Sequence, residues 1–344
     1  MRLNAAFRDQ AGHCAALGSP FMARLMGLMA GHWPLDRALA ARMEAWPGDV
    51  GPKGVSLPLR LAGGLHALKL LGVAPDLAAA YPPNEVPDAQ LLAALRGAML
   101  QHADFLDRWI DSAPQTNELG RSAVLIAAAR WLAARHDLPL ILSELGASAG
   151  LNLHFDRYAL RVGGRDYGPA NPVLALEPDW RGPDPAAAGI KVTDRAGADL
   201  NPLDPTDDED ALRLLAYLWP DQPERLARTR AALALPPAPV AQGDAIDWLR
   251  MRLAAPKPGH LHLIFHTIAW QYFPAETQAR GQAMIEAAGM AATHDAPLAW
   301  LGMEADGHTP GAAVTLRLWP GDLHLSLGRA CFHGRWVQWM PEPV

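Results

Sequence analysis

The residues best suited to chemistry lie in one short stretch of the chain, residues 139–152. An apolar run ends at the acidic residue Glu144, and a turn of small residues follows from Gly146 to Gly150. Because glycine lacks a Cβ atom, the backbone N–H groups of such a turn can approach a ligand closely. A segment compatible with a helix begins at Leu151. A strand, a glycine-rich turn and a helix in this order are typical of a loop that binds a nucleotide or a related cofactor.

The same turn also fits a second chemistry. Gly146-Ala-Ser148-Ala-Gly150 matches the Gly-x-Ser-x-Gly elbow that carries the nucleophilic serine of α/β-hydrolases. A hydrolase would also need a later acid and a later histidine, for which His324 and His333 are available. Its sheet would need several strands before the elbow, whereas the residues before Pro139 have helical spacing. The dinucleotide pattern Gly-x-Gly-x-x-Gly is absent, which disfavours a dinucleotide site.

The first chemistry predicts a class I S-adenosylmethionine site. In such a site an acid ends the first strand, an acid after the second strand binds the ribose hydroxyls, and an acid after the third reads the adenine amino group. Asp199, or with less support Asp194, is the candidate for ribose, and Asp244 is the candidate for adenine. The predicted cofactor-binding residues are Glu144, Gly146, Ser148, Gly150, Asn152, Asp199 and Asp244.

His266 is the candidate catalytic residue, since it follows the apolar run Leu261–Phe265. Ligands bind at the carboxyl ends of parallel strands, where a neutral imidazole could take a proton from the methyl acceptor. The alternative is a structural histidine that is hydrogen-bonded to a loop. Trp270, Gln271 and Tyr272 follow closely and are candidate substrate-binding residues, with packing under the next helix as their alternative.

The polar segment 115–121 opens a predicted helix. Capping by Thr116 or Asn117, and the favourable place of Glu118 in the first turn, account for most of its residues. They do not account for the position of Asn117, Glu118 and Arg121 near one helical face. These three are therefore candidate substrate-binding residues. His260 and His262 alternate with other residues along a strand, but no carboxylate or cysteine is spaced to complete a metal site, so no metal is expected.

Composition narrows the class of protein. The chain has 344 residues, half of them hydrophobic, and a formal net charge of −6. An acidic balance spread along the chain argues against a nucleic-acid partner. The two cysteines form no Cys-x-x-Cys motif and suit a reducing compartment. No signal-peptide pattern and no apolar run of roughly 20 residues is present, so we expect a cytoplasmic protein without a membrane partner. The oligomeric state is not indicated.

Hydrophobic spacing divides the chain into two regions. Residues 1–136 show helical periodicity and predict an all-helical N-terminal domain or cap. From residue 137 to 344, strand-like runs alternate with helical ones, which is typical of an α/β fold. We expect a Rossmann-like, methyltransferase-type sheet there, mostly parallel and ending in an antiparallel C-terminal hairpin. A segment near 158–190, rich in glycine and proline, predicts an insertion that begins with a β-hairpin.

Four long motifs resemble a known family. They are Glu144-Leu-Gly-Ala-Ser-Ala-Gly-Leu-Asn-Leu, Asp199-Leu-Asn-Pro-Leu-Asp204, Trp219-Pro-Asp-Gln and Phe265-His-Thr-Ile-Ala-Trp-Gln-Tyr. Over nearly its whole length the chain resembles domain of unknown function 2332, a bacterial family similar in fold to class I methyltransferases and without an established substrate. The resemblance implies the fold and a cofactor loop, and it does not imply a reaction.

Together these observations predict an S-adenosylmethionine-dependent methyltransferase that acts on a small molecule of unknown identity. Class I methyl transfer needs little from the protein beyond in-line placement of the acceptor and the methyl sulfonium, so the lack of a catalytic motif is tolerable. Two alternatives stay open. The fold could bind another ligand or act without catalysis, or Ser148 could be the nucleophile of a hydrolase.

Overall fold

The structure of the protein is a computed structural model that describes residues 2–342. Its contacts group the chain into two compact units. One consists of Met1–Thr116 with Asp207–Arg230, and the other of Asn117–Thr206 with Ala231–Val344. The units do not follow the boundary expected at residue 136, because helix α8 (Ser122–His136) packs against elements of the second unit. No helix among the described residues is long and apolar enough to cross a membrane.

The first unit is built from helices. They are α1 (Arg2–Ala16), α2 (Pro20–His32), α3 (Arg37–Glu44), α4 (Leu57–Leu70), α5 (Pro75–Ala80), α6 (Asp88–Gln101), α7 (Ala103–Trp109), α9 (Asp208–Ala216) and the start of α10 (Pro223–Leu233). Ser19 caps α2 by accepting a hydrogen bond from the Met22 N–H, and a proline at the first helical position suits this end.

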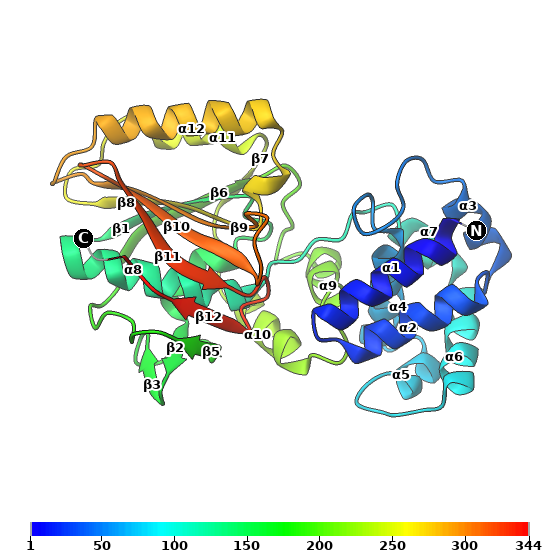
Figure 1. Ribbon diagram of the computed structural model, residues 1–344. Coiled ribbons are helices and arrows are strands. Elements are labelled where there is room, and N and C mark those ends of the chain that lie inside the picture. Colours follow the sequence, from blue (N-terminus) through cyan, green and yellow to red (C-terminus); the bar gives the residue numbers. More distant parts are fainter. Residues whose placement is uncertain (1, 343–344) are drawn as a thin grey trace. The chain divides into compact units, whose positions relative to one another are not determined.

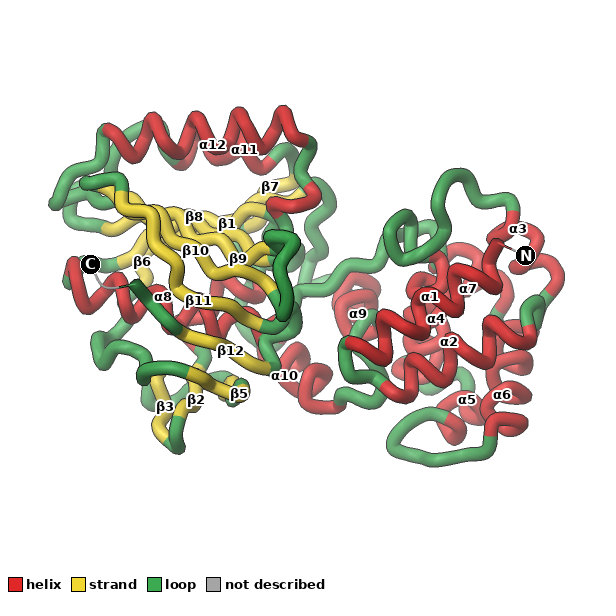
Figure 2. Tube along the Cα trace, viewed as in Figure 1, coloured by secondary structure: helices red, strands yellow, loops and turns green. Residues whose placement is uncertain are grey.

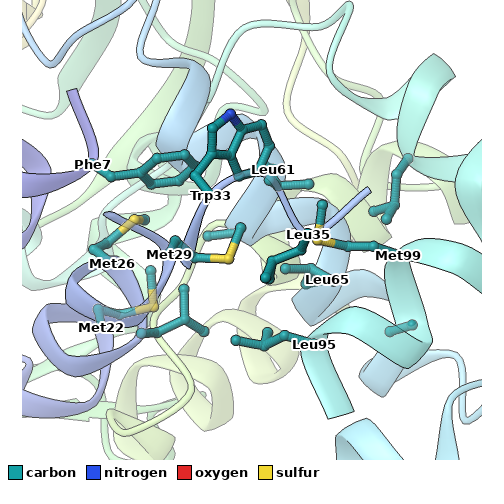
Figure 3. Close-up of a cluster of buried hydrophobic side chains, with 14 of the residues drawn as sticks. Phe7, Met22, Met26, Met29, Trp33, Leu35, Leu61, Leu65, Leu95 and Met99 are labelled. Carbon is teal, nitrogen blue, oxygen red and sulfur yellow. The ribbon is translucent and has the colours of Figure 1, made fainter. Parts of the chain in front are cut away.

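The core of the first unit is rich in methionine. Methionines recur at the three- and four-residue spacing of one face of α2, and Trp33 continues this face beyond the end of the helix. Figure 3 shows these side chains packed among leucines of α4 and α6, and those labelled are Phe7, Met22, Met26, Met29, Trp33, Leu35, Leu61, Leu65, Leu95 and Met99. Helix α4 also meets α9 closely at Gly63, where a Cβ atom would lie 2.5 Å from the Tyr217 ring.

The second unit contains a nine-stranded sheet in the order β5-β12-β11-β10-β9-β8-β1-β6-β7. Its strands are β1 (Leu140–Leu145), β5 (Asp179–Arg181), β6 (Val192–Asp199), β7 (Val240–Gln242), β8 (Leu261–Thr267), β9 (Leu298–Glu304), β10 (Ala312–Trp319), β11 (Leu323–Ala330) and β12 (Trp336–Trp339). The run β7-β6-β1-β8-β9 is parallel, and β9 to β12 form an antiparallel meander. The predicted mixed α/β fold with a mostly parallel sheet is confirmed.

Helices cover both faces of this sheet. α11 (Ala245–Arg252) and α12 (Ala275–Met290) lie over one face and α8 lies over the other, as Figure 1 shows. The sides of α11 and α12 that face the sheet bury Ile246, Leu249 and Ile285 against Ile264 of β8. Because parallel strands with helices on both faces are shielded from water, β1 and β8 are buried along their whole length.

The direction of strand addition reverses beside β1. The next strands of the large sheet that pair in parallel, β6 and β7, lie on one side of β1, and β8 lies on the other. Such a reversal is a topological switch point, and open α/β sheets bind ligands beside it, at the carboxyl ends of the strands. Here those ends carry the turn after Glu144 and residues 266–272.

The predicted insertion carries a small sheet. After the 3₁₀-helix η2 (Leu151–Arg157), the strands β2 (Ala159–Val162), β3 (Arg165–Tyr167) and β4 (Ala175–Leu176) form a sheet in the order β3-β2-β4. Figure 2 shows β2 and β3 side by side, apart from the large sheet. The hairpin between β2 and β3 turns at Gly163 and Gly164, both at positive φ, as the sequence predicts. Strand β5 then leaves the insertion and joins the large sheet beside β12.

Candidate functional site

The turn after Glu144 is folded tightly against the end of β6. The N–H groups of Gly146 and Ala147 both donate to the Ala198 carbonyl, at 2.9 and 3.1 Å. Gly146 and Gly150 have φ values of 74° and 71°, in the left-handed region that favours glycine. A Cβ atom at Gly146 would also lie 2.5 Å from the Ala269 Cβ, so the position has no room for a side chain.

Asp199 joins β6 to this turn. Its Oδ2 accepts a hydrogen bond from the Ser148 N–H at 2.8 Å, and its Oδ1 accepts one from the Asn201 N–H at 2.9 Å. Asp194 lies opposite Ile141, near the start of the same strand, and pairs with Arg252 at 2.7 Å. The structure therefore brings Asp199 to the turn and leaves Asp194 away from it.

Glu144 is buried at the carboxyl end of β1. It is 1% exposed, and its Oε2 has no hydrogen-bond partner among the described residues. Burial raises the pKa of this carboxyl well above its ordinary value, and the nearby charge of Asp199 raises it further, while Arg121 opposes the shift. The protonated form is therefore favoured far more than in an exposed glutamate.

The polar segment before α8 lies against the same turn. Asn117 Oδ1 accepts a hydrogen bond from the Leu151 N–H at 2.8 Å, so it binds the first residue after the turn. Glu118 Oε1 accepts one from the Gly120 N–H at 2.9 Å and caps the 3₁₀-helix η1 (Leu119–Arg121). Asn117 and Glu118 are 6% and 3% exposed. They precede the helices, and the common helical face suggested by their spacing does not form.

Arg121 and Asn152 form hydrogen bonds with neighbouring elements. Arg121 donates through Nη1 to the Thr267 carbonyl at the end of β8, and through Nε to the Phe332 carbonyl, both at 2.9 Å. Asn152 is 1% exposed, and its Oδ1 accepts a hydrogen bond from Ser122 Oγ at 2.7 Å. The predicted residues of the turn and of the segment before α8 thus make separate hydrogen bonds, mostly to the main chain of neighbouring segments.

His266 belongs to a polar network at the end of β8. Its Nδ1 lies 2.8 Å from Glu304 Oε1, and its Nε2 accepts a hydrogen bond from Trp300 Nε1 at 3.0 Å. Its ring stacks on Trp270, with the ring centres 5.1 Å apart. The Glu304 carboxylate also accepts the N–H groups of Ala269 and Trp270. Burial acts to raise the pKa of Glu304, but these hydrogen bonds outweigh it and hold the pKa below its ordinary value.

The partners of His266 fix its tautomer. An indole N–H can only donate, so Nε2 must be the acceptor, and the proton of a neutral ring is on Nδ1, facing Glu304. Removing a proton from a substrate would require Nε2 to leave Trp300. The catalytic role of His266 stays a prediction. Sequence reasoning missed Glu304, although it ends an apolar strand just as Glu144 does.

The three candidate residues 270–272, shortly after β8, have different surroundings. They form the 3₁₀-helix η3 (Trp270–Tyr272). Trp270 packs against Trp300 and Phe273, and Gln271 Oε1 accepts a hydrogen bond from the Ala305 N–H at 3.0 Å. Tyr272 is 74% exposed. Packing therefore accounts for Trp270, while Tyr272 keeps a large surface that packing does not use.

Asp244 follows the carboxyl end of β7, and Asp199 lies at the carboxyl end of the neighbouring parallel strand β6. The two positions are linked, because the Gly243 N–H donates to the Asp199 carbonyl at 2.9 Å. Asp244 Oδ1 caps α11 by accepting the N–H groups of Ile246 and Asp247, and Oδ2 pairs with Arg280 at 3.2 Å. The helix cap explains one oxygen of Asp244, and its role toward adenine stays a prediction.

Comparison with known proteins identifies the family. A family model described as "Uncharacterized protein conserved in bacteria (DUF2332)" matches residues 4–339. The chain belongs to this family. The resemblance of the four sequence motifs is thereby confirmed over nearly the whole chain. Searches of curated proteins and of solved structures gave no match.

One of the two late histidines that the sequence offers for hydrolase chemistry, His324, is distant from Ser148 in this DUF2332 protein. His324 lies in β11, and β8, β9 and β10 separate β11 from β1. At about 4.8 Å per strand, four steps across the sheet span roughly 19 Å. His324 instead lies 3.4 Å from Asp322, at the turn of the β10–β11 hairpin. This position does not favour a triad that includes His324.

Proposed function

We propose that the protein binds S-adenosylmethionine at the carboxyl ends of β1, β6 and β7 and transfers the methyl group to a small molecule. The observation that carries the proposal is the hydrogen bond from the Ser148 N–H to Asp199 Oδ2. It joins the glycine turn and the acid of the neighbouring strand in one site beside the topological switch point.

The sheet supports this proposal through its order. The parallel strands β1, β6 and β7 are neighbours in this order, with an acid or a glycine turn at each carboxyl end, and the parallel strand β8 lies on the other side of β1. We infer that the second unit is a Rossmann-like, methyltransferase-type domain and that the helices α1 to α7 form a separate N-terminal domain. The antiparallel strands β10 and β11 supply the expected C-terminal hairpin.

The residues present suit such a cofactor. Each carboxylate oxygen of Asp199 accepts one main-chain N–H, and each keeps a lone pair that could accept a ribose hydroxyl. The buried Oε2 of Glu144, which has no partner among the described residues, could accept a hydrogen bond from a polar group of the ligand. Asp244 Oδ2, which pairs with the half-exposed Arg280 and with no other residue of the described chain, lies at the proposed adenine end of this row.

The chain's own contribution would be placement. S-adenosylmethionine supplies the methyl sulfonium, and the protein needs to hold the acceptor in line with it and to exclude water. His266 and Glu304 act as positioning residues in this proposal, because together they fix η3 through the Ala269 and Trp270 N–H groups. Tyr272, the exposed residue of η3, is then the candidate contact for the acceptor.

Isothermal titration calorimetry tests the binding step. We expect the wild-type protein to bind S-adenosylmethionine and S-adenosylhomocysteine. Asp199→Asn puts an N–H donor where an acceptor is needed, so it should weaken both by about tenfold or more. Asp166→Asn, the same substitution in a solvent-exposed ion pair of the β2–β3 hairpin, is the matched control and should leave both affinities unchanged. Wild-type protein that binds neither ligand, or equal affinities in wild type and Asp199→Asn, would refute the proposal.

A binding function without catalysis is the second candidate. It is favoured by one observation, namely that both ring nitrogens of His266 already have partners. The two candidates differ in turnover. Under the first, incubation with a library of small nucleophiles yields S-adenosylhomocysteine that mass spectrometry detects. Under the second, the cofactor binds and no such product accumulates.

A further inference from the structure

The second unit contains a cavity far from the proposed cofactor site. It has a volume of about 390 Å³ and lies where α11 and α12 meet the starts of β8 and β9. Figure 1 shows these two helices together over one face of the sheet. The turn after Glu144 follows the carboxyl end of β1, which is parallel to β8. The cavity and the turn therefore lie at opposite ends of the parallel strands.

The wall of the cavity is apolar and made largely of small side chains. Alanines of α12 and of the segment after it form one side, among them Ala288 and Ala292. Leu253 and Leu298 line the cavity as well, and Leu298 is 4% exposed. Small side chains leave room for a ligand, and a volume of this size is within the usual range for small-molecule sites, roughly 300–1,000 Å³.

Positive charge lies at the exposed residues of the cavity. The exposed Arg250 and Lys257 line it, and its lining residues include no aspartate or glutamate within the described part of the chain. Arg250 forms an ion pair with Asp247 at 3.3 Å. By contrast, the structure gives Lys257 no carboxylate within ion-pair distance among residues 2–342. The exposed Lys257 is therefore the cation that is available to an anionic ligand.

The buried end of the cavity is uncharged. His262 lines it and is 7% exposed, with its Nε2 2.8 Å from Ser143 Oγ. Burial first, and the charge of Arg252 second, lower the pKa of His262 to about 3, so its ring is neutral near pH 7. Positive charge is thus confined to the exposed side, and the inner wall offers apolar surface together with one neutral imidazole.

We propose that this cavity binds an aliphatic carboxylate, with its hydrocarbon chain against Ala288, Ala292 and Leu298 and its carboxylate beside Lys257. The arrangement is complementary to such a molecule at both ends, because the wall removes apolar surface from water and the exposed lysine attracts the negative charge. Ser143 is fully buried, so the inference concerns binding only. It does not depend on the proposed methyltransferase function.

A series of ligands tests the two parts of this inference. Hexanoate, octanoate and decanoate, titrated calorimetrically, should bind with affinities that rise about fourfold for each added methylene, because each buried CH₂ removes apolar surface from water. Nonylammonium has the same alkyl chain as decanoate and the opposite charge, and it should bind more weakly than decanoate. Absence of decanoate binding, or equal binding of decanoate and nonylammonium, would overturn the proposal.

Two variants locate the site. Lys257→Glu should weaken decanoate binding by about fivefold or more. Lys53→Glu, the same charge change at an exposed lysine of the first unit, is the matched control and should leave the affinity unchanged. Ala288→Phe places a large side chain in the cavity and should weaken decanoate binding by about tenfold or more. If decanoate binds to both cavity variants as it does to wild type, the ligand site is elsewhere and the proposal fails.

Discussion

Replacing Glu144 by glutamine tests whether the fold raises the pKa of the acid near the end of β1. The substitution keeps the shape of the side chain and removes its ionisation. In the wild type, burial and the charge of Asp199 raise the pKa of Glu144 well above its ordinary value of 4.5, and Arg121 compensates for only part of this shift. The stability of the folded protein should therefore depend on the ionisation of this one carboxyl.

The sign and size of the effect follow from proton linkage. Between pH 4.5 and the raised pKa, the folded state holds the Glu144 proton more often than the unfolded state. The stability contributed by the protonated acid is fully present below the unfolded-state pKa and is lost as the pH rises to the folded-state pKa. Within this window the free energy of unfolding of the wild type should fall, relative to Glu144→Gln, by about 1.4 kcal/mol per pH unit.

Urea unfolding of both proteins, measured from pH 4.5 upward, gives the difference directly. Titrating groups that do not interact with Glu144 contribute equally in both proteins, so their contributions cancel in the difference. We expect the difference to decline with pH and then to level off above the folded-state pKa of Glu144. A carboxyl ¹³C NMR titration of Glu144 should locate the same pKa. A difference that stays constant over the whole range, with a titration near pH 4.5, would refute the reasoning.

Two further predictions concern backbone and burial. Gly146→Ala should lose more than about 1 kcal/mol of stability, from its positive φ and the 2.5 Å approach to the Ala269 Cβ, whereas Gly27→Ala, in an exposed part of α2 with open space around it, should gain about 0.5–1 kcal/mol. Equal urea-unfolding effects of the two would contradict the turn geometry. Burial, the main cause, lowers the pKa of His66 from 6.5 to about 4, so the unfolded state binds the proton between these values. Stability should fall by up to about 1.4 kcal/mol per pH unit as the pH drops through this window, and a His66→Gln variant with the same acid slope would count against this explanation.

Local sequence patterns predict much of the second unit. A short run that ends at Gly243 and the helix cap Asp244 predicts a strand over 240–242, and β7 (Val240–Gln242) lies there. The strand Leu261–Phe265 is also correct and continues to Thr267, since the His266 side chain and the Thr267 carbonyl find partners inside the fold. The glycine pair at 163–164 likewise predicts the β2–β3 hairpin from its turn geometry alone.

Non-local pairings limited the rest. Strand β5 lies within a segment expected to be an insertion loop, and it forms because β12, which lies far along the chain, pairs with it. The helix expected after Gly150 is the short 3₁₀-helix η2, and the main chain then leaves for the small sheet. No local pattern reveals such partners, because the pairing energy comes from residues distant in sequence.

The candidate site was only partly predictable for the same reason. Glycines and acids at strand ends mark the turn and Asp199, because those requirements are local. The spacing of Asn117 and Glu118 indicates a common helical face, yet both precede the helices, and Asn117 is hydrogen-bonded to Leu151, 34 residues away. The His266–Glu304 contact spans 38 residues and appears only once β8 and β9 pair.

A crystal structure of the protein grown with saturating S-adenosylhomocysteine is the most direct test of the central claim. The account predicts the ligand along the turn from Gly146 to Gly150, with its ribose hydroxyls within hydrogen-bond distance of the Asp199 carboxylate. A ligand bound at another place, or a turn without ligand at saturating concentration, would contradict it.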